Sequence, residues 1–370
     1  MDAKQKKSIL IKLILIIIFT LIGIFLPKLL ANETDFVERV FSRGIYPVVS
    51  RVVGAATSIV PFSIVEFLLY ALVIGVPLSF IIVIVRIFKK KSKLVGLLNI
   101  ILNYLLSAAL ILNVFYFFWG FNYSRMKLAD IMKFEVGKYS KEELLKLSIM
   151  LADDAALLRE DMPENKDGVF YIPKDEYAKY LEIVADSYSS NFMKELSPIF
   201  EAPVYKAKTV TYSEGLSILG ISGIFIPFTE ECNINVNQPT LYTFFDAAHE
   251  NAHFLGIARE DEASFSAYLT CKNSDDAVLR YSATMSALSS CANKLNEDDG
   301  ALYSELAEHY SDGMLRDFSN YNEYYDKYDT PVREISEQTN DNYLKHNNQE
   351  TGIKSYGMMV DLLLAYYKID

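Results

Sequence analysis

Three long apolar runs dominate the first third of the chain. They lie at residues 8–30, 64–87 and 94–118, and few charged side chains interrupt them. A helix crosses the hydrocarbon core of a bilayer in about 20 apolar residues, so each run is long enough to span it. The pattern predicts a membrane domain with three transmembrane helices within residues 1–120.

Further along, apolar and polar positions follow helical spacing. Ser140 and Glu143 form a capping-box pattern, in which each side chain accepts a hydrogen bond from the other residue's backbone N–H. This box opens an amphipathic helix over 140–161, and a second helix is expected over 174–196. The part of the chain outside the spans therefore begins as a helical structure.

The character of the chain changes again at residues 203–236. This stretch has strand-like content with Gly, Ser and Pro nearby, and helical periodicity returns at Thr240 and persists to the C-terminus. The expected fold class is therefore mainly α. Three N-terminal transmembrane helices are followed by one mostly helical domain over 121–370, which contains a small β-element.

The distribution of charge predicts a sidedness. Basic residues cluster around positions 4–12 and 86–93, whereas Asp and Glu dominate after residue 140, in a chain of net charge −11. Short positive segments stay on the cytoplasmic side of a membrane. We therefore expect a cytoplasmic N-terminus, with residues 32–62 and everything after Trp119 outside. The lipid bilayer is an expected partner, and nucleic acid is not, because no basic surface is indicated.

Residues 36–60 join the first two spans. They mix apolar stretches with Arg39, Arg43 and Arg51. This mixture is typical of a segment that lies along a membrane surface with its apolar side toward the lipid. We expect it at the outer interface.

Three cysteines, Cys232, Cys271 and Cys291, are too few for a disulfide framework. We interpret them as buried thiols that pack as small hydrophobic side chains. The alternative is a bridge between Cys271 and Cys291 in an oxidising compartment, with one thiol left free.

The candidate chemistry lies in residues 246–271, which contain two of the four histidines of the chain. His249 and His253 are four residues apart, so on a helix both imidazoles face the same side. Two neutral imidazoles and a carboxylate suit one zinc ion and leave a position for water. Glu250, beside the first histidine, would be the general base of an H-E-x-x-H site. The alternative is two histidines on a polar helix face without a metal.

A third metal ligand has to come from the residues that follow. Gly256 can end the helix in a left-handed turn, after which the chain folds back toward the same ion. One class of metalloprotease has a histidine at the position of Arg259. Here the adjacent Glu260 is the favoured ligand, and it begins "EDEAS", which resembles the E-x-x-A-[DN] signature of gluzincin-type zinc peptidases. Glu262 is the rival.

Two further segments are candidates for substrate contacts. Residues 223–236, "GIFIPFTEECNINV", precede the metal helix, and such a strand could pair with the backbone of a peptide substrate, or could be a plain structural hairpin. Near the C-terminus, a donor from Tyr356 or His346 could stabilise an oxyanion. Among 25 tyrosines, a packing role for Tyr356 is the stronger expectation.

The chain as a whole resembles an uncharacterised bacterial family of three-span membrane proteins with a zinc-peptidase-like outer domain, known as domain of unknown function 3810. The matching pieces are "SRGIYP", "VPFSIVE", "FFWGFNYSR", "GIFIPFTEECNIN", "HENAHFLGIAREDEASFSAYL" and "SYGMMVDLLLAYY". The resemblance implies a bacterial cell membrane, metal and base roles for His249, Glu250 and His253, and an acidic ligand from "REDEAS". Asn251 and Ser264 depart from zinc-peptidase motifs, which usually carry an apolar residue and an Asn or Asp there.

Together these patterns favour a membrane-anchored zinc metallopeptidase, with one zinc ion, that acts on a peptide or protein outside the cytoplasmic membrane. The alternative is a non-catalytic membrane protein whose zinc is structural or whose zincin-like domain binds a partner. Glu250 favours the enzyme, because a structural site has no need for a base beside its ligands. Intramembrane proteolysis is excluded, because the histidine stretch is polar and lies far from the spans.

Overall fold

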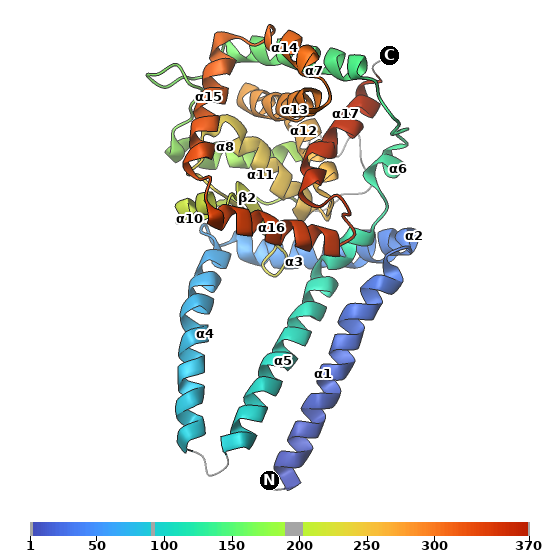
Figure 1. The fold of residues 1–370 in the computed structure, drawn as a ribbon, viewed down its shortest axis with the longest axis vertical. Helices are drawn as coiled ribbons and strands as arrows, with labels where there is room; N and C mark the ends of the chain where they lie inside the picture. The colour runs from blue at the N-terminus through green and yellow to red at the C-terminus, as the bar shows by residue number, and fades with distance from the viewer. Residues whose placement is uncertain (1–2, 90–92, 189–202, 369–370) are drawn as a thin grey trace.

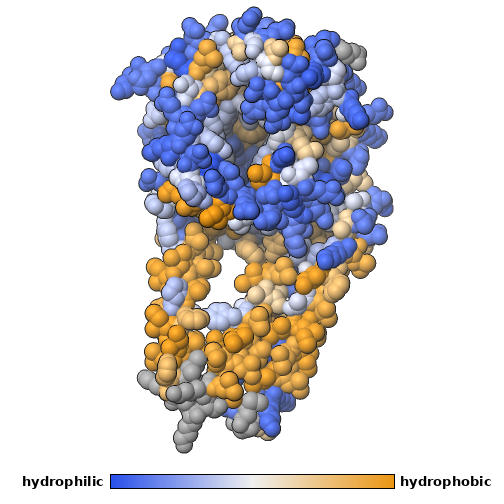
Figure 2. Space-filling model, viewed as in Figure 1, coloured by the Kyte–Doolittle hydropathy of each residue, from blue (hydrophilic) through white to orange (hydrophobic). Residues whose placement is uncertain are grey.

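The computed structural model describes residues 3–89, 93–188 and 203–368. Three long helices, α1 (Ala3–Leu30), α4 (Ile64–Lys89) and α5 (Lys93–Phe118), extend from one side of a helical body (Figure 1). Each is long and apolar enough to cross a membrane. Apolar surface covers these helices, whereas the body is mostly polar (Figure 2). The three predicted spans are thus confirmed as helices able to cross a membrane, and they indicate a membrane protein.

The remaining helical elements form the body and its junction with the three long helices. They are α2 (Thr34–Phe36), the π-helix η1 (Val37–Ile45), α3 (Tyr46–Ser58), η2 (Gly120–Ser124), α6 (Leu128–Met132), α7 (Lys141–Arg159), η3 (Lys174–Glu176), α8 (Tyr177–Ser187), α10 (Ser213–Ile218), α11 (Thr240–Phe254), α12 (Glu260–Lys272), α13 (Ala277–Asp298), α14 (Gly300–Ala307), α15 (Asp312–Lys327), α16 (Pro331–His346), η5 (Gly352–Met358) and α17 (Met359–Tyr367). The predicted mainly helical fold is confirmed.

Local signals place the first body helix as expected. Ser140 accepts a hydrogen bond from the Glu143 N–H, and the Glu143 side chain accepts one from the Ser140 N–H, so the capping box opens α7. The second predicted helix appears as η3 and α8, and the rest of its predicted range, 189–196, lies outside the described residues. α7 then packs on α13, and α13 in turn packs on α11 and α12.

A buried charge network fastens α7 to α15. The carboxylate of Asp317 accepts hydrogen bonds from Arg159 Nε at 2.7 Å, the Tyr281 hydroxyl at 2.6 Å and the Phe170 N–H at 2.7 Å. Arg159 and Asp317 are both buried. Loss of one partner from such a pair costs about 3–5 kcal/mol, since the other charge is left buried and unpaired. This network therefore holds the side of the core that faces away from the membrane helices.

The small β-element is a three-stranded sheet of order β1-β3-β2. β1 (Lys208–Thr209) runs parallel to β3 (Glu231–Ile234), and β2 (Gly223–Ile226) runs antiparallel to β3, with Phe225 opposite Cys232. All four residues of β3 are buried. β2 is an edge strand of this sheet, and it lies against α11, the helix that carries the histidines.

The segment between the first two spans crosses the ends of the long helices that adjoin the body (Figure 1). It forms η1 and α3, and large apolar side chains such as Val48 and Val52 are exposed on it. Tyr46, in contrast, is buried in the same core as side chains of α11. The position suits the expected interfacial role, and the division of the chain at residue 120 stays a prediction.

Cys232, Cys271 and Cys291 are free and buried. Burial raises the pKa of each thiol above its ordinary value, because the thiolate would lose its hydration. The interpretation as packed thiols is confirmed, and the alternative Cys271–Cys291 bridge is absent.

Candidate metal centre

α11 brings the two histidines together. His249 and His253 lie on one face of this buried helix, with their ring centroids 4.7 Å apart and their planes nearly perpendicular. Small residues before and between them, such as Ala248 and Ala252, are fully buried and let the helix pack closely inside the body. The i, i+4 spacing thus acts as the sequence predicts.

The turn after α11 returns the chain to the same face. Gly256 has φ +80°, a left-handed conformation, and the Gly256 N–H donates to the His253 carbonyl at 2.8 Å. A side chain at this position would also meet the ring of Tyr46 at 2.9 Å. α12 then begins at Glu260, whose Oε2 lies 3.0 Å from His249 Nε2 and 3.3 Å from His253 Nε2.

The Nδ1 atom of each histidine has a hydrogen-bond partner outside the candidate ligand group. His253 Nδ1 is 2.7 Å from the Ile257 carbonyl oxygen, and His249 Nδ1 is 3.1 Å from Ser264 Oγ. Nδ1–H of His253 donates to that carbonyl, so in the neutral ring Nε2 carries the lone pair that can bind a metal. Ser264 thus supplies at this position the contact that an Asn or Asp provides in related motifs. Both Nε2 atoms face Glu260.

These three residues fit a metal ion. Their ligand atoms all lie within 4.8 Å of one another, and no other group of three or more His, Cys, Asp or Glu side chains among the described residues has this arrangement. Ligands of a tetrahedral zinc, with bonds of about 2.0–2.2 Å, lie roughly 3.3 Å apart. The separation of 3.3 Å agrees with that spacing, and the one of 3.0 Å is slightly shorter.

The electrostatics of the centre favour a cation. Burial alone would raise the pKa of Glu260, but the charge of His253 and hydrogen bonds from both histidines lower it to about 2. Burial would lower the pKa of His253, but Glu260 foremost raises it to about 9. The pKa of His249 is lowered, mainly by burial. The position between Glu260 and His253 therefore attracts positive charge, which a divalent ion supplies in place of a proton.

Glu250 lies beside the three ligands but is not one of them. A Cβ added to Gly223 in β2 would come within 2.8 Å of the Glu250 carboxylate, so this side chain lies against the edge strand. Burial, followed by the charges of Glu260 and Asp246, raises the pKa of Glu250 to about 8, partly offset by His253 and the Phe225 N–H. The carboxyl group thus has a raised proton affinity next to the candidate ion.

Glu262, the rival ligand, faces elsewhere. Its Oε1 accepts a hydrogen bond from the Leu128 N–H at 2.8 Å and lies 3.9 Å from Arg259 Nε. Burial and the charge of Asp261 raise its pKa to about 7. The structure therefore brings Glu260 to the histidines and uses Glu262 to hold the start of α6.

Tyr356 is close to the centre and His346 is not. The Tyr356 ring stacks on His249 with centroids 5.9 Å apart, and its hydroxyl accepts a hydrogen bond from Asn340. The surroundings of this hydroxyl, first by desolvation and then by the charge of Glu260, raise its pKa well above the ordinary value. His346 is exposed at the end of α16 and is absent from the candidate group.

Several residues lie near the centre although no motif in the sequence pointed to them. The Gln349 side chain accepts a hydrogen bond from the Glu260 N–H at 3.2 Å. The hydroxyl of Tyr123 donates to that of Tyr343 at 3.1 Å, and the charge of Glu260 contributes to the raised pKa of both. Tyr123 stands in the quoted piece "FFWGFNYSR", but its pairing with α16 is not visible in the sequence.

The C-terminal end of α11 is capped by residues next to the membrane helices. The last carbonyls of a helix have no partner within it. Here the His253 carbonyl accepts from Trp119 Nε1 at 3.1 Å, the Phe254 carbonyl from the Tyr46 hydroxyl at 2.7 Å, and the Gly256 carbonyl from Arg125 Nη1 at 2.8 Å. The metal helix is thereby fastened to the junction with the spans.

Asn251 is the one poorly accommodated residue of the motif. It is fully buried, and neither its amide nitrogen nor its oxygen has a hydrogen-bond partner among the residues that the structure describes. An unsatisfied buried polar group costs about 1–3 kcal/mol. The departure from an apolar residue at this position is therefore a local cost in packing and removes no metal ligand.

Comparison with known proteins places the chain in a wider group. The sequence model of a family described as "Protein of unknown function (DUF3810)" matches residues 41–364, which is most of the chain. No curated protein and no solved structure matches it.

Proposed function

The chain belongs to the DUF3810 family of proteins of unknown function, and from its metal centre we propose that it is a membrane-anchored zinc metallopeptidase acting outside the cytoplasmic membrane of a bacterium. The observation that carries the proposal is the convergence of His249, His253 and Glu260, with Glu250 beside them as a carboxylate outside the candidate ligand group. Zinc is preferred among divalent ions because two imidazoles and one carboxylate suit it.

The residues divide the work of hydrolysis. Zinc, when bound, would polarise the scissile carbonyl and acidify a water molecule. Glu250 takes a proton from the attacking water, whose oxygen bonds to the carbonyl carbon. The C–N bond then breaks, and Glu250 passes the proton to the leaving amine. Tyr356, stacked on His249, is the candidate donor to the oxyanion.

The open edge of β2 is the proposed place for the substrate backbone. The Asn235 N–H donates to the Ser222 carbonyl, so residues 222 and 235 form a hydrogen-bonded pair of the hairpin. Pairing alternates along antiparallel strands, so the main-chain groups of Gly223 and Phe225 point away from β3. The Phe225 N–H already donates to Glu250, which lies directly beside this edge, and an extended peptide can add to the remaining outward groups.

One observation favours the second candidate, a structural zinc site in a non-catalytic protein. His249, Glu250, His253 and Glu260 are each at most 7% exposed, and α16 and η5 place Tyr343 and Tyr356 near them. A catalytic centre needs an open coordination position that substrate can reach. Hydrolysis of peptides by the zinc-loaded protein would distinguish the two candidates.

Metal content and hydrolysis together test the proposal. We expect full-length protein purified in detergent to contain about one zinc per chain, and His253→Ala to contain little. Elemental mass spectrometry measures this directly. A chelator is expected to abolish cleavage of a randomised peptide pool, and added zinc to restore it. Zinc-loaded wild type that leaves the pool intact would support the structural alternative, and a folded wild type without metal would contradict both.

The proposed orientation has its own test. A reporter enzyme that works only after export is expected to be active when fused after Asp370, because the body would lie outside. The N-terminal end of α1 and the first turn of α5 lie at the same end, far from the body, as this sidedness requires (Figure 1). An inactive exported reporter, together with an active cytoplasmic reporter at the same position, would reverse the orientation.

A further inference from the structure

α4 stands apart from the other two membrane helices. α1 and α5 pack closely: a Cβ on Gly23 would meet Leu112 at 2.9 Å, and Asn113 Nδ2 donates to the Phe19 carbonyl at 2.7 Å. In contrast, no residue in the most apolar part of α4 is buried. Near mid-length α4 and α5 touch, with the hydroxyls of Ser79 and Tyr104 2.9 Å apart. Between this contact and the body, Figure 2 shows an opening.

The metal centre lies next to the end of α5 that adjoins the body. Trp119 directly follows the last residue of α5, and its ring centroid is 6.0 Å from that of His253 and 5.6 Å from that of Phe225 in β2. The candidate ligand and the edge strand are therefore one side chain away from the end of a membrane span.

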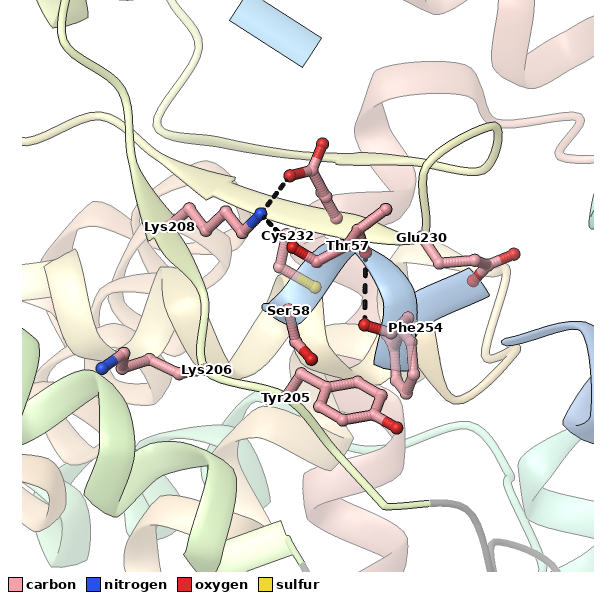
Figure 3. Close-up of a pocket in the computed structure, with 10 residues that line it drawn as sticks. Thr57, Ser58, Tyr205, Lys206, Lys208, Glu230, Cys232 and Phe254 are labelled. Carbon is pink, nitrogen blue, oxygen red and sulfur yellow. Dashed lines mark hydrogen bonds and ion pairs between the residues drawn. The ribbon is translucent and has the colours of Figure 1, made fainter. Parts of the chain in front are cut away.

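The side of α4 is tied to the same sheet. The Glu231 carboxylate of β3 accepts hydrogen bonds from the N–H groups of Ile64 and Val65 at the start of α4, and it forms an ion pair with Lys208. Figure 3 shows Lys208 reaching Thr57, near the end of α3, whose carbonyl accepts from it at 2.8 Å. The cavity there, of about 10 Å³, is too small for a ligand and has room for about one water at most. These polar contacts hold the start of α4 and the end of α3 against the sheet.

The turn between β2 and β3 lies over the opening. In Figure 1 it is the yellow loop that hangs below α16, between the upper ends of α4 and α5. Phe228 in this turn is 43% exposed. An exposed aromatic ring at the end of the spans suits the interface between lipid and water. The open edge of β2 therefore leads down toward the bilayer.

We propose that the substrate class of this centre is the stem of another membrane protein, which rises from the bilayer between α4 and α5, adds to β2 and is cut next to its membrane segment. The inference rests on the proposed peptidase function. An extended chain rises about 3.3 Å per residue, so a stem that leaves the bilayer beside Trp119 reaches His253 within a few residues. The reaction is the peptide hydrolysis given under the proposed function. The membrane-anchored product keeps the few residues between its membrane segment and the cut.

A cleavage experiment tests the position of the cut. Zinc-loaded full-length protein is placed in phosphatidylcholine–phosphatidylglycerol vesicles with peptides that carry a Leu/Ala anchor of about 20 residues. One pool has a randomised stem next to the anchor, a second has it beyond a long Gly/Ser spacer, and a third has no anchor. Anchoring confines the first two pools to the same membrane, and the spacer varies only the distance of the randomised segment from that membrane. We expect cleavage of the first pool at least about tenfold faster than of the second, with cuts beside the anchor. Equal rates for all three pools would overturn the proposal and leave the peptidase function standing.

A crosslinking experiment tests docking without hydrolysis. Benzoylphenylalanine replaces Phe228 in the zinc-loaded Glu250→Gln variant, and in a matched variant it replaces Leu157, which is exposed on α7 far from the spans (Figure 1). We expect crosslinks from position 228 to the first pool and none from position 157. Crosslinks at 228 without any cleavage by wild type would keep the substrate class and contradict the peptidase function. No crosslink at 228, or equal crosslinks at both positions, would overturn the docking site.

Discussion

Glu250→Gln is expected to keep the metal and to lower peptide hydrolysis by about two to four orders of magnitude, the usual contribution of a general base. Glutamine has nearly the same shape, so the buried contact with Gly223 and β2 is preserved. It cannot take a proton from water, and this is the only function that the substitution removes. The expected result is therefore a loaded, folded and inactive protein.

Zinc content and the rate of cleavage of the randomised pool, measured on the same preparations, check this result. Glu305→Gln, at an exposed position of α14, is the matched control and should hydrolyse the pool at the wild-type rate. Cleavage by Glu250→Gln at the rate of wild type would show that another group is the base. Loss of zinc from this variant would instead place Glu250 among the ligands.

Glu260→Ala is expected to weaken zinc binding far more than Glu262→Ala. Glu260 Oε2 is the oxygen that faces both histidines, whereas the Glu262 carboxylate accepts from the Leu128 N–H. Loss of a residue that only orients a ligand typically costs 10- to 100-fold in metal affinity, and loss of Glu260 should exceed about 100-fold. Glu262→Ala should stay within a few-fold of wild type.

Competition with a chelating dye measures both affinities, and thermal unfolding of the same variants shows whether each protein is folded. Glu262→Gln is a useful third variant, because its amide oxygen still accepts from Leu128 while its charge is gone. If Glu262→Ala lost more affinity than Glu260→Ala, the third ligand would be Glu262. Equal small losses would indicate that neither carboxylate binds the metal.

The parts of this protein that local physics controls were predictable from the sequence. The length of the three apolar runs is enough to define helices that can cross a membrane, because bilayer thickness sets that length. The capping box at Ser140 and Glu143 depends only on residues three apart. The shared face of His249 and His253 and the left-handed turn at Gly256 are likewise set within a few residues. The geometry of such features is set by residues close together in the sequence.

The tertiary structure decided what depends on residues far apart in the chain. The sequence favours Glu260 but leaves Glu262 open as the third ligand, and only the packing of α12 against Leu128 directs one to the histidines and the other away. The caps on α11 from Tyr46 and Trp119 join residues separated by 208 and 134 positions. The same long-range packing sets β2 beside Glu250 and brings the metal centre to the end of α5, because no local pattern specifies which distant surfaces meet.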